Sequence, residues 1–530
     1  MRRWNGWGDD AIDYPVPHSA TRFLEQRIGA GHGKPSARLA DVVATIAPSR
    51  LPPHPLADRD PEARLRHARG QSLPNWIAMR SGRIGTVPDG VARPTTREQV
   101  RELLDYATHT GVRLIPYGGG TSVVGHVDPP AGDAPVLTVS MARCNGLLRF
   151  DEISQLATFG AGVAGPDLEA QLRARGFTLG HFPQSFEYST VGGWIATRSS
   201  GQQSLGYGRI EQLFAGGRVE APAGTLELPP YPASAAGPDL REIVLGSEGR
   251  LGIITEATLR VSPLPERERF YAVFLPAFAD GLAAVRELVQ ARLPLSMLRL
   301  STAVETETTL RLAGHERLIQ ALERVLAMQG AGPEKCMLLL GFTGRKSLVT
   351  SARKDAIAIA GAHRGMRAGG AVVGKQWQRS RFRVPYLRNA LWDAGYAADT
   401  LETATRWSQL PRLVQAVEAA LEHALTEGGE RVHVFTHLSH FYPDGASLYT
   451  TYLFRLAADP DETLHRWQAL KGAASRAIVA HGGTISHHHG VGTDNAPYLA
   501  AEKGELGMHV LRDLCARFDP GGLLNPGKLV

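Results

Sequence analysis

A glycine-rich run that follows a short predicted strand restricts the fold more than any other feature of this chain. Residues 100–109 predict a helix, and residues 112–116 predict the strand. Because glycine lacks a Cβ atom, the run can turn sharply and present successive N–H groups to a phosphate or pyrophosphate. An ordinary turn between strands is the alternative, and the spacing excludes the G-x-G-x-x-G and G-x-x-x-x-G-K-S/T motifs. The residues of the run are Pro116, Tyr117, Gly118, Gly119, Gly120, Thr121 and Ser122.

Two later segments, 184–201 and 246–256, share this mixture of glycine, hydroxyl side chains and a few apolar residues. Such a backbone suits close contact with a large, flat ligand that has polar edges. Together with residues 116–122, these segments predict a cofactor site. Their candidate residues are Gln184, Ser185, Ser189, Thr190, Gly193, Thr197, Arg198, Ser199, Ser200, Glu248, Gly249, Leu251, Gly252, Ile253 and Ile254.

The order of the three segments resembles FAD-binding domains of the vanillyl-alcohol oxidase type. In that superfamily the glycine-rich loop holds the pyrophosphate, and the other two segments line the isoalloxazine and the ribityl chain. Within it, Trp4–Gly8, Ser189–Trp194 and Ser486–Gly492 resemble motifs of the alkyldihydroxyacetonephosphate synthase family. This similarity runs with gaps from near residue 4 to the C-terminus.

A chain of 530 residues exceeds what one hydrophobic core usually serves, so at least two domains are expected. The resemblance implies an α+β fold with a two-subdomain FAD-binding domain of the vanillyl-alcohol oxidase type. It also implies a cap domain with a mixed sheet and helical N- and C-terminal extensions. The expected parts are an N-terminal extension at 1–82, the FAD-binding domain at 83–265, the cap and substrate domain at 266–470, and a C-terminal segment at 471–530 that completes the active site.

Local patterns predict several elements of these domains. A hydroxyl cap followed by a carboxylate predicts a helix that starts near residue 96, and Asp459 with Pro460 predicts the start of a helix over 461–481. The loop over 229–238 is rich in proline, alanine and glycine and is expected to be an exposed insertion. Further predicted elements are a helix over 167–175, strands over 270–275, 297–300 and 337–342, and a helix over 281–292.

Three consecutive histidines, His487, His488 and His489, follow a turn and are expected on a strand. On a strand, the first and third would share one face, where two histidines can bind zinc. No Asp, Glu or Cys stands at a supporting position in the sequence, so no metal is expected. The resemblance favours a proton-transfer cluster beside the flavin, because the histidine pKa lies near neutrality. Histidines packed in a polar interior are the remaining alternative.

Tyr449 matches the family segment that carries the active-site tyrosine. A buried phenol can donate or accept a proton, and a nearby positive charge would favour its anionic form. An aromatic residue that only packs in an alternating strand is the alternative explanation. Tyr452, three residues later, is the competing assignment.

Two arginines are expected to bind substrate. Arg299 lies among apolar residues on a predicted strand, where an unpaired guanidinium would be costly to bury, and it matches a functionally required family arginine. Arg388 matches the family arginine that contacts the substrate phosphate, a role that suits bidentate donation. Structural ion pairs with Glu305 or Asp393 are the alternative for both.

By this resemblance the chain is an FAD-dependent alkyl transferase that exchanges the acyl chain of acyl-dihydroxyacetone phosphate for a long-chain alcohol in ether-lipid synthesis. The exchange involves no net redox change. FAD is expected to bind non-covalently, because the turn over 118–122 lacks histidine and cysteine and because His126 and His181 lie outside the matched segments. An FAD-dependent oxidase or dehydrogenase of a 2-hydroxy acid or alcohol shares these loops. A flavin-binding protein with a degenerate site is a third hypothesis.

The net charge of +6 fits a lipid-like phosphorylated substrate or an anionic membrane surface. Nucleic acid is not expected as a partner, because no Lys/Arg block with interleaved aromatic residues is present. Cys144, Cys336 and Cys515 are odd in number and far apart, which fits a reducing compartment. The expected location is the cytoplasm, and a peripheral membrane contact and a homodimer are left open.

Overall fold

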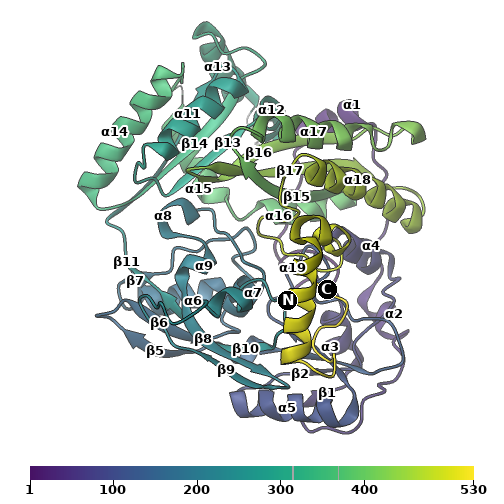
Figure 1. Cartoon of the computed structure of the whole chain (residues 1–530). Helices are drawn as coiled ribbons and strands as arrows, with labels where there is room; N and C mark the ends of the chain where they lie inside the picture. Colours follow the sequence, from purple (N-terminus) through teal and green to yellow (C-terminus); the bar gives the residue numbers. More distant parts are fainter. Residues whose placement is uncertain (313–315, 368) are drawn as a thin grey trace.

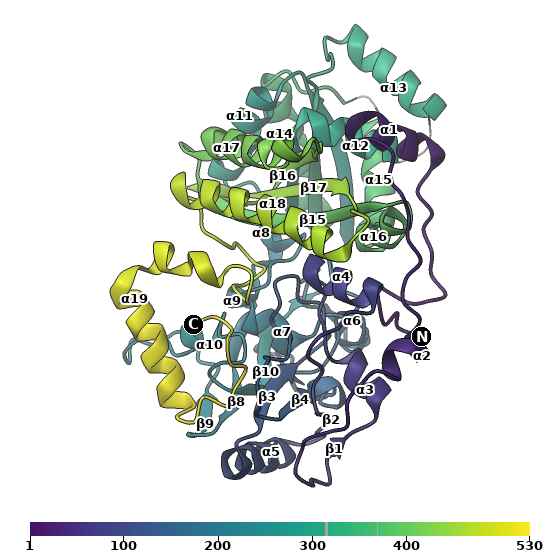
Figure 2. The ribbon, with the colours of Figure 1, turned by 90° about the vertical axis from the view of Figure 1, so that its right-hand side faces the viewer.

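Two parts lie one above the other in the computed structural model, which describes residues 1–312, 316–367 and 369–530 (Figure 1). The lower part holds strands β1 to β10, and the upper part holds β12 to β17 with most of the long helices. Helix α19 (Ala496–Phe518) descends from beneath the upper part to the lower part, as Figure 2 shows, and is kinked at Gly504. Among the described residues, no helix is both long and apolar enough to cross a bilayer.

The first sheet of the lower part carries the glycine-rich run at the end of a strand. Its strand order is β1 (Ala57–Asp58), β2 (Gly90–Ala92), β4 (Val136–Ser140) and β3 (Arg113–Tyr117). The last three strands are parallel and β1 is antiparallel, so this sheet is mixed. Helix α5 (Arg97–Thr110) begins where predicted, because the Thr96 hydroxyl accepts the Gln99 N–H, and it buries its apolar face on this sheet.

The second sheet of the lower part is antiparallel, and one of its strands contains the end of the third predicted cofactor segment. Its order is β5 (Leu147–Asp151), β6 (Leu156–Gly160), β10 (Ile253–Arg260), β8 (Phe214–Ala221) and β9 (Gly224–Leu228). The shorter elements nearby are α6 (Gly165–Arg173), α7 (Val191–Ala196), α8 (Ser204–Tyr207), α9 (Ile210–Leu213), α10 (Arg241–Val244) and the pair β7 (Phe177–Thr178) with β11 (Ser262–Pro263). Residues 229–240 are exposed and lack a strand or helix, as expected of an insertion.

The upper part is built on a six-stranded sheet. Its order is β12 (Arg267–Leu275), β14 (Cys336–Gly344), β13 (Met297–Ser301), β16 (His433–Tyr442), β17 (Gly445–Arg455) and β15 (Tyr396–Arg406). The strands predicted over 270–275, 297–300 and 337–342 lie within β12, β13 and β14. All its strand pairs are antiparallel, so the prediction of a mixed sheet in the cap is wrong in that detail. The mixed pairing belongs to the first sheet instead, and the α+β fold itself is as predicted.

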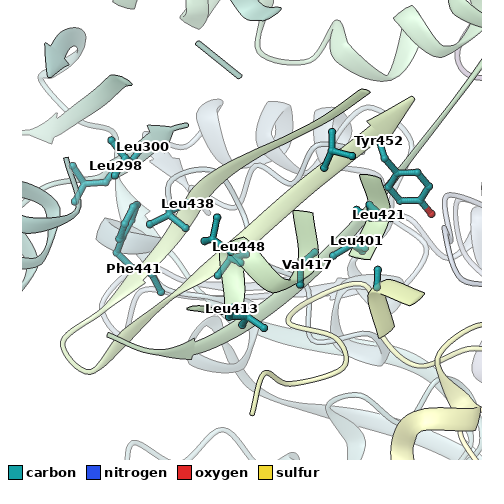
Figure 3. Packing of buried hydrophobic residues seen from close by; sticks show 14 of the residues in the cluster. Leu298, Leu300, Leu401, Leu413, Val417, Leu421, Leu438, Phe441, Leu448 and Tyr452 are labelled. Carbon is teal, nitrogen blue, oxygen red and sulfur yellow. The ribbon is translucent and has the colours of Figure 1, made fainter. Parts of the chain in front are cut away.

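The two faces of this cap sheet differ in chemistry because side chains alternate along each strand. Leu300, Leu438 and Leu448 are register partners and form an apolar row. That row packs against α17 (Leu410–His423), as the close view in Figure 3 shows. The neighbouring row, on the other face, consists of Ser301, His437, Tyr449 and Glu402. A polar face is thereby turned away from the helices that bury the apolar face.

Helices enclose the cap sheet and tie the N-terminus to it. Helix α1 (His18–Ile28) buries Phe23 and Ile28 against Leu391 and Tyr396 of the cap, so the N-terminal extension is not a separate unit. The remaining elements of the N-terminal part are α2 (Leu39–Val43), α3 (Pro61–Arg66), α4 (Leu73–Ser81) and η1 (Met141–Arg143). Those of the cap are α11 (Phe278–Gln290), α12 (Ala303–Leu312), α13 (Glu316–Met328), α14 (Lys346–Ala362), α15 (Gly370–Ser380), α16 (Val384–Asp393), η2 (Thr426–Gly428) and α18 (Pro460–Ala480).

The C-terminal tail returns to the first sheet beside the glycine-rich run. The Leu114 N–H donates to the Leu523 carbonyl, and the Asn525 N–H donates to the Leu114 carbonyl, both at 2.8 Å. Leu524 forms a parallel bridge with Leu114 and is fully buried in the α5 core. The end of the chain therefore fixes the strand from which the glycine-rich run emerges.

The buried Leu524 side chain should account for much of this attachment. Leu524→Ala should lower the free energy of unfolding by about 2–5 kcal/mol, because it leaves a cavity in a closed core. Leu523→Ala, in the half-buried neighbour, is the matched control and should cost less. Thermal unfolding followed by circular dichroism checks both variants, and equal losses would contradict a specific role for Leu524.

Candidate active site

The glycine-rich run packs directly on the second predicted cofactor segment. A Cβ atom on Gly118 would collide with the Thr190 hydroxyl, and one on Gly119 would collide with the Tyr188 carbonyl. Gly120 has a φ of +63°, which disfavours other residues. Gly118 and Gly119 are therefore required by the close approach of the two segments, and Gly120 is required by its backbone conformation and its contact with Tyr117. The predicted pyrophosphate loop thus lies against residues 188–190.

The third segment joins the other two and the histidine motif through Glu248. Its carboxylate accepts the N–H groups of Val491 and Gly492, and it lies 3.1 Å from His126 Nε2. His126 Nδ1 in turn lies 2.7 Å from the Ser122 hydroxyl of the glycine-rich run. The Glu248 N–H donates to the Ala196 carbonyl at 3.0 Å. All three cofactor segments thus meet in space, although about 125 residues separate the first from the last.

These residues fit a large cofactor with polar edges. Thr190 Oγ1 and His181 Nδ1 are buried and lack a hydrogen-bond partner within the described chain, so donors and acceptors remain for a ligand. The glycine backbones supply further N–H groups at the same place. Not every predicted residue turns toward this region. The Arg198 side chain bonds to Glu242 and the Leu245 carbonyl, and Ile253 and Ile254 pack in hydrophobic cores.

The histidine motif is not a strand, so that prediction is wrong. Residues 481–495 form turns and bends, because they must wrap around one buried carboxylate rather than pair with a sheet. That carboxylate is Glu402 of β15, whose side chain is buried. His487 Nδ1 lies 3.1 Å from its Oε1, and His488 Nδ1 is in close contact with its Oε2. His489 Nε2 lies 4.0 Å from Oε2, so all three histidines surround this single acid.

Burial opposes a charge on Glu402, yet the imidazoles of His488 and His487 hold the pKa of this carboxyl well below its ordinary value. Burial lowers the pKa of His487 to about 4 and that of His489 to about 3. Arg209 Nη1 donates to His487 Nε2 at 2.8 Å, which requires that nitrogen to be unprotonated. The imidazoles of His487 and His489 are therefore neutral beside an ionised Glu402.

The ligand atoms of Glu402, His440, His487 and His488 lie within 4.8 Å of one another and could hold a cation. The sequence-based reason against a metal was that no carboxylate supports the histidines. That reason is wrong, because Glu402 reaches them from a strand more than 80 residues earlier. Hydrogen bonds within the protein also account for the positions of these groups. His487 bonds to Glu402 and Arg209, and His440 Nδ1 lies 3.1 Å from the Ser200 hydroxyl.

The sheet separates the two tyrosine candidates. Tyr449 lies on the polar face, where its ring stacks on His437 at 4.9 Å and meets His489 edge-on at 5.9 Å. Burial raises its pKa to about 12, so the phenol keeps its proton at neutral pH. Tyr452 lies on the apolar face, where it is fully buried and donates to Asp399 at 3.0 Å. Tyr449 alone of the two adjoins the histidines.

Arg299 forms an ion pair with Glu305, which was the structural alternative to a role in substrate binding. Its Nη2 lies 2.6 Å from Glu305 Oε1, which also lies 2.9 Å from His437 Nδ1. Burial opposes a charge on Glu305, but His437 and Arg299 lower its pKa to about 2. A chain of contacts across the polar face therefore links Arg299 to Glu305, Glu305 to His437, and the His437 ring to Tyr449.

Arg388 does not pair with Asp393, which bonds to Arg80 instead. Its Nη1 donates to the Gln71 carbonyl at 2.8 Å, and its guanidinium lies 4.4 Å over the Trp76 ring. Its Nη2 is buried and has no hydrogen-bond partner in the part of the chain that the structure describes. Burial lowers the pKa of this group. A buried donor of this kind is available for an anionic ligand.

Sequence reasoning missed several residues of this site. Glu402, His437 and His440 come from strands, and Arg209 and Tyr442 complete the contacts of His487. The spacing of His437, His440 and Tyr442 along one strand was a visible signal. Only the pairing register of the strands shows that Glu402 and Tyr449 lie on the same face of the sheet as His437.

Two protein-family models match this chain. The model of an FAD binding domain matches residues 88–228, and the model of the FAD linked oxidase C-terminal domain matches residues 264–529. FAD is therefore the cofactor. The first match falls on the lower part of the fold, and the second covers the upper part together with α19 and the C-terminal tail.

Three relatives define the family more closely. Alkyldihydroxyacetonephosphate synthase of Dictyostelium discoideum is 32% identical over 89% of this chain and 78% of that protein. The synthase of Trypanosoma brucei brucei is 29% identical over 100% of this chain and 92% of that protein. A solved alkyldihydroxyacetonephosphate synthase structure superimposes with a TM-score of 0.85 at 28% identity, covering 100% of this chain and 99% of that one. This chain belongs to the alkyldihydroxyacetonephosphate synthase family, as its motifs predicted.

Proposed function

We propose that this FAD-dependent enzyme exchanges the acyl chain of acyl-dihydroxyacetone phosphate for a long-chain alcohol, which yields an ether-lipid precursor. Two observations support the proposal: Arg388 has a buried donor without a partner in the described chain, and a protonated Tyr449 on the polar face of the cap sheet adjoins the histidines that surround Glu402. In the exchange, the bond between C1 and the ester oxygen breaks, the fatty acid leaves with that oxygen, and the alcohol oxygen bonds to C1 as it loses its proton.

The residues of the lower part would hold FAD. Gly118, Gly119 and Gly120 would approach its pyrophosphate, and Thr190 would offer its unpartnered hydroxyl. When bound, FAD supplies the reactive centre that makes exchange at the substrate carbon feasible. We expect the attachment to be non-covalent, since the glycine-rich turn has no histidine or cysteine.

Arg388 would anchor the substrate phosphate. Its stacking on Trp76 and its bond to the Gln71 carbonyl fix the guanidinium, and Nη2 would then donate to a phosphate oxygen. A charge-assisted bond of this kind contributes about 1.5–3 kcal/mol. Arg299 would act differently, by holding Glu305 and His437 and through them the Tyr449 ring.

The polar face would move the protons. The attacking alcohol must lose a proton, and the neutral imidazole of His489 is the proposed acceptor. Burial makes this imidazole a weak base, and the nearby Glu402 carboxylate partly offsets that effect by stabilising its protonated form. Tyr449 keeps its proton and can donate a hydrogen bond to a developing negative charge. His487 and His488 contact Glu402 and would fix its position. The negative charge of Glu402 would compensate the positive charge of Arg209, which bonds to His487. Because both substrates carry long alkyl chains, we also expect them to be taken from a membrane surface.

A single anaerobic experiment tests this function. Purified enzyme mixed with acyl-dihydroxyacetone phosphate and labelled fatty alcohol should form labelled ether product with release of fatty acid and without net flavin reduction. Acid precipitation of the same sample should release FAD into the supernatant. Flavin bleaching by a 2-hydroxy acid or alcohol that persists until oxygen enters would instead identify an oxidase or dehydrogenase.

Tyr449→Phe isolates the phenol from the packing of its ring. Turnover should fall by about 100-fold or more, the usual range for a positioned proton donor, with little change in melting temperature. Tyr452→Phe is the matched control: it removes the bond to Asp399 and should lower stability more than turnover. Steady-state kinetics and thermal unfolding of both variants check this. Near-normal turnover in Tyr449→Phe would assign the chemistry elsewhere.

The pKa shifts of the histidines predict an unusual dependence on pH. Unfolded histidines have pKa values near 6.5, above those of folded His487 and His489, so the unfolded state binds more protons between pH 6.5 and about 4. Stability should be fully present above pH 6.5 and should fall by about 1.4 kcal/mol per pH unit and per histidine below it. Turnover should nevertheless stay nearly constant from pH 7.5 to 5.5, because the proton acceptors remain neutral.

Thermal unfolding and initial rates over this pH range check that prediction. His489→Gln, which removes one titrating group, should show a shallower loss of stability below pH 6.5. A roughly tenfold fall in turnover at pH 5.5 would mean that the essential imidazole titrates near its ordinary pKa. Loss of activity in chelator, with rescue by zinc, would mean that the cluster holds a metal.

A further inference from the structure

The N-terminal motif Trp4-Asn5-Gly6-Trp7-Gly8 has no role in the function proposed above, yet it packs on the helix that carries Arg388. Asn389, the next residue of α16, accepts the Trp7 N–H at 3.1 Å and donates to the Trp7 carbonyl at 2.9 Å. These bonds connect residues 382 positions apart. A pair of hydrogen bonds from one side-chain amide to both the N–H and the carbonyl of a single residue fixes the motif against α16 in a single register.

The glycines of the motif are required by this contact. A Cβ atom on Gly6 would collide with Asn389 Oδ1, and one on Gly8 would collide with the Tyr386 ring of the same helix. Gly6 and Gly8 are both buried, and Gly8 has a φ of +89°. The spacing of tryptophan and glycine in the motif therefore follows from the surface of α16.

Gln71 connects the N-terminal motif to Arg388 and to the glycine-rich run. Its carbonyl accepts Arg388 Nη1 at 2.8 Å, and its N–H donates to the Ser122 carbonyl of the glycine-rich run at 2.6 Å. Its side chain donates to the Gly6 carbonyl at 3.4 Å. One residue therefore bonds to the substrate arginine, to the cofactor loop and to the N-terminal motif.

Trp7 makes a second connection to the cofactor segments. Its ring meets the Tyr188 ring edge-on at 5.5 Å with an interplanar angle of 88°. The Tyr188 carbonyl is the atom against which Gly119 packs. Trp7 is nine-tenths buried or more, so its ring forms a wall between α16 and the second cofactor segment.

We propose that the segment Trp4–Gly8 is a positioning element that holds Arg388 at a fixed place relative to the glycine-rich run, acting through Asn389 and Gln71. It would thereby set the affinity for the phosphorylated end of the substrate. This inference rests on the proposed role of Arg388 as the phosphate anchor. None of the five residues needs to touch substrate for the effect.

Gly6→Ala tests the element without changing any group that bears charge. Calorimetric titration of the FAD-loaded enzyme with dihydroxyacetone phosphate should show a Kd raised at least fivefold, and KM should rise while kcat changes less than twofold. Unphosphorylated dihydroxyacetone should bind as it does to wild type. Gly361→Ala is the matched control, because a Cβ there meets nothing within 4 Å, and it should leave the Kd unchanged.

Trp7→Ala is a second disruption in case Gly6→Ala does not fold, and Trp7→Phe is its conservative partner. Trp7→Ala should raise the Kd for dihydroxyacetone phosphate, whereas Trp7→Phe keeps the backbone bonds and an aromatic wall and should stay within twofold of wild type. Loss of FAD and of folding in both Gly6→Ala and Trp7→Ala would overturn the inference, since the segment would then serve general stability.

Arg388→Ala, measured in parallel, separates this inference from the function on which it rests. A Kd raised tenfold or more in Arg388→Ala, together with wild-type binding in Gly6→Ala and Trp7→Ala, would overturn the positioning role alone. An unchanged Kd in Arg388→Ala would overturn the phosphate anchor itself, and with it the reason for a positioning element.

Discussion

The antiparallel register of the cap sheet is the constraint on which the site depends. In that register Ser301, His437, Tyr449 and Glu402 face one way, and the leucines one position along face the helices. A shift of one residue would exchange the two sets and bury the ionisable groups among leucines. The apolar packing of Figure 3 therefore determines which side chains form the polar face, as well as stabilising the cap.

Electrostatic cost explains why the polar groups are so tightly grouped. An ionised Glu402 buried without partners would be strongly unfavourable, and removing one partner of such a buried charge typically costs about 3–5 kcal/mol. The histidine loop, Arg209 and Tyr442 all converge on this region from different parts of the chain. Arg299, Glu305 and His437 form a second compensated group on the other side of Tyr449. The phenol lies between two networks that fix its surroundings.

Close approach between backbone segments, made possible by glycine, is the second constraint on the site. Glycine allows the glycine-rich run to lie on residues 188–190, and it allows the N-terminal motif to lie on α16. In both places a side chain would collide, so the positions are determined by tertiary contact rather than by turn geometry alone. Gln71 connects the two contacts, and the tail around Leu524 holds the strand that leads into the loop. The glycine-rich run, Arg388 and the N-terminal motif are thus parts of one packed structure.

The sequence by itself determined the family, the α+β fold and the cofactor through motifs that resemble those of the family. It also determined most local elements, because helix caps and hydrophobic periodicity are local properties. It also identified Tyr449, Arg388 and the histidines as candidates, through matching motifs. Only the tertiary structure revealed Glu402, excluded Tyr452 from the polar face and replaced the expected histidine strand with a loop. It also showed the cap sheet to be antiparallel. The physical reason is that strand register and the partners of a buried charge are set by residues distant in sequence, which no local pattern encodes.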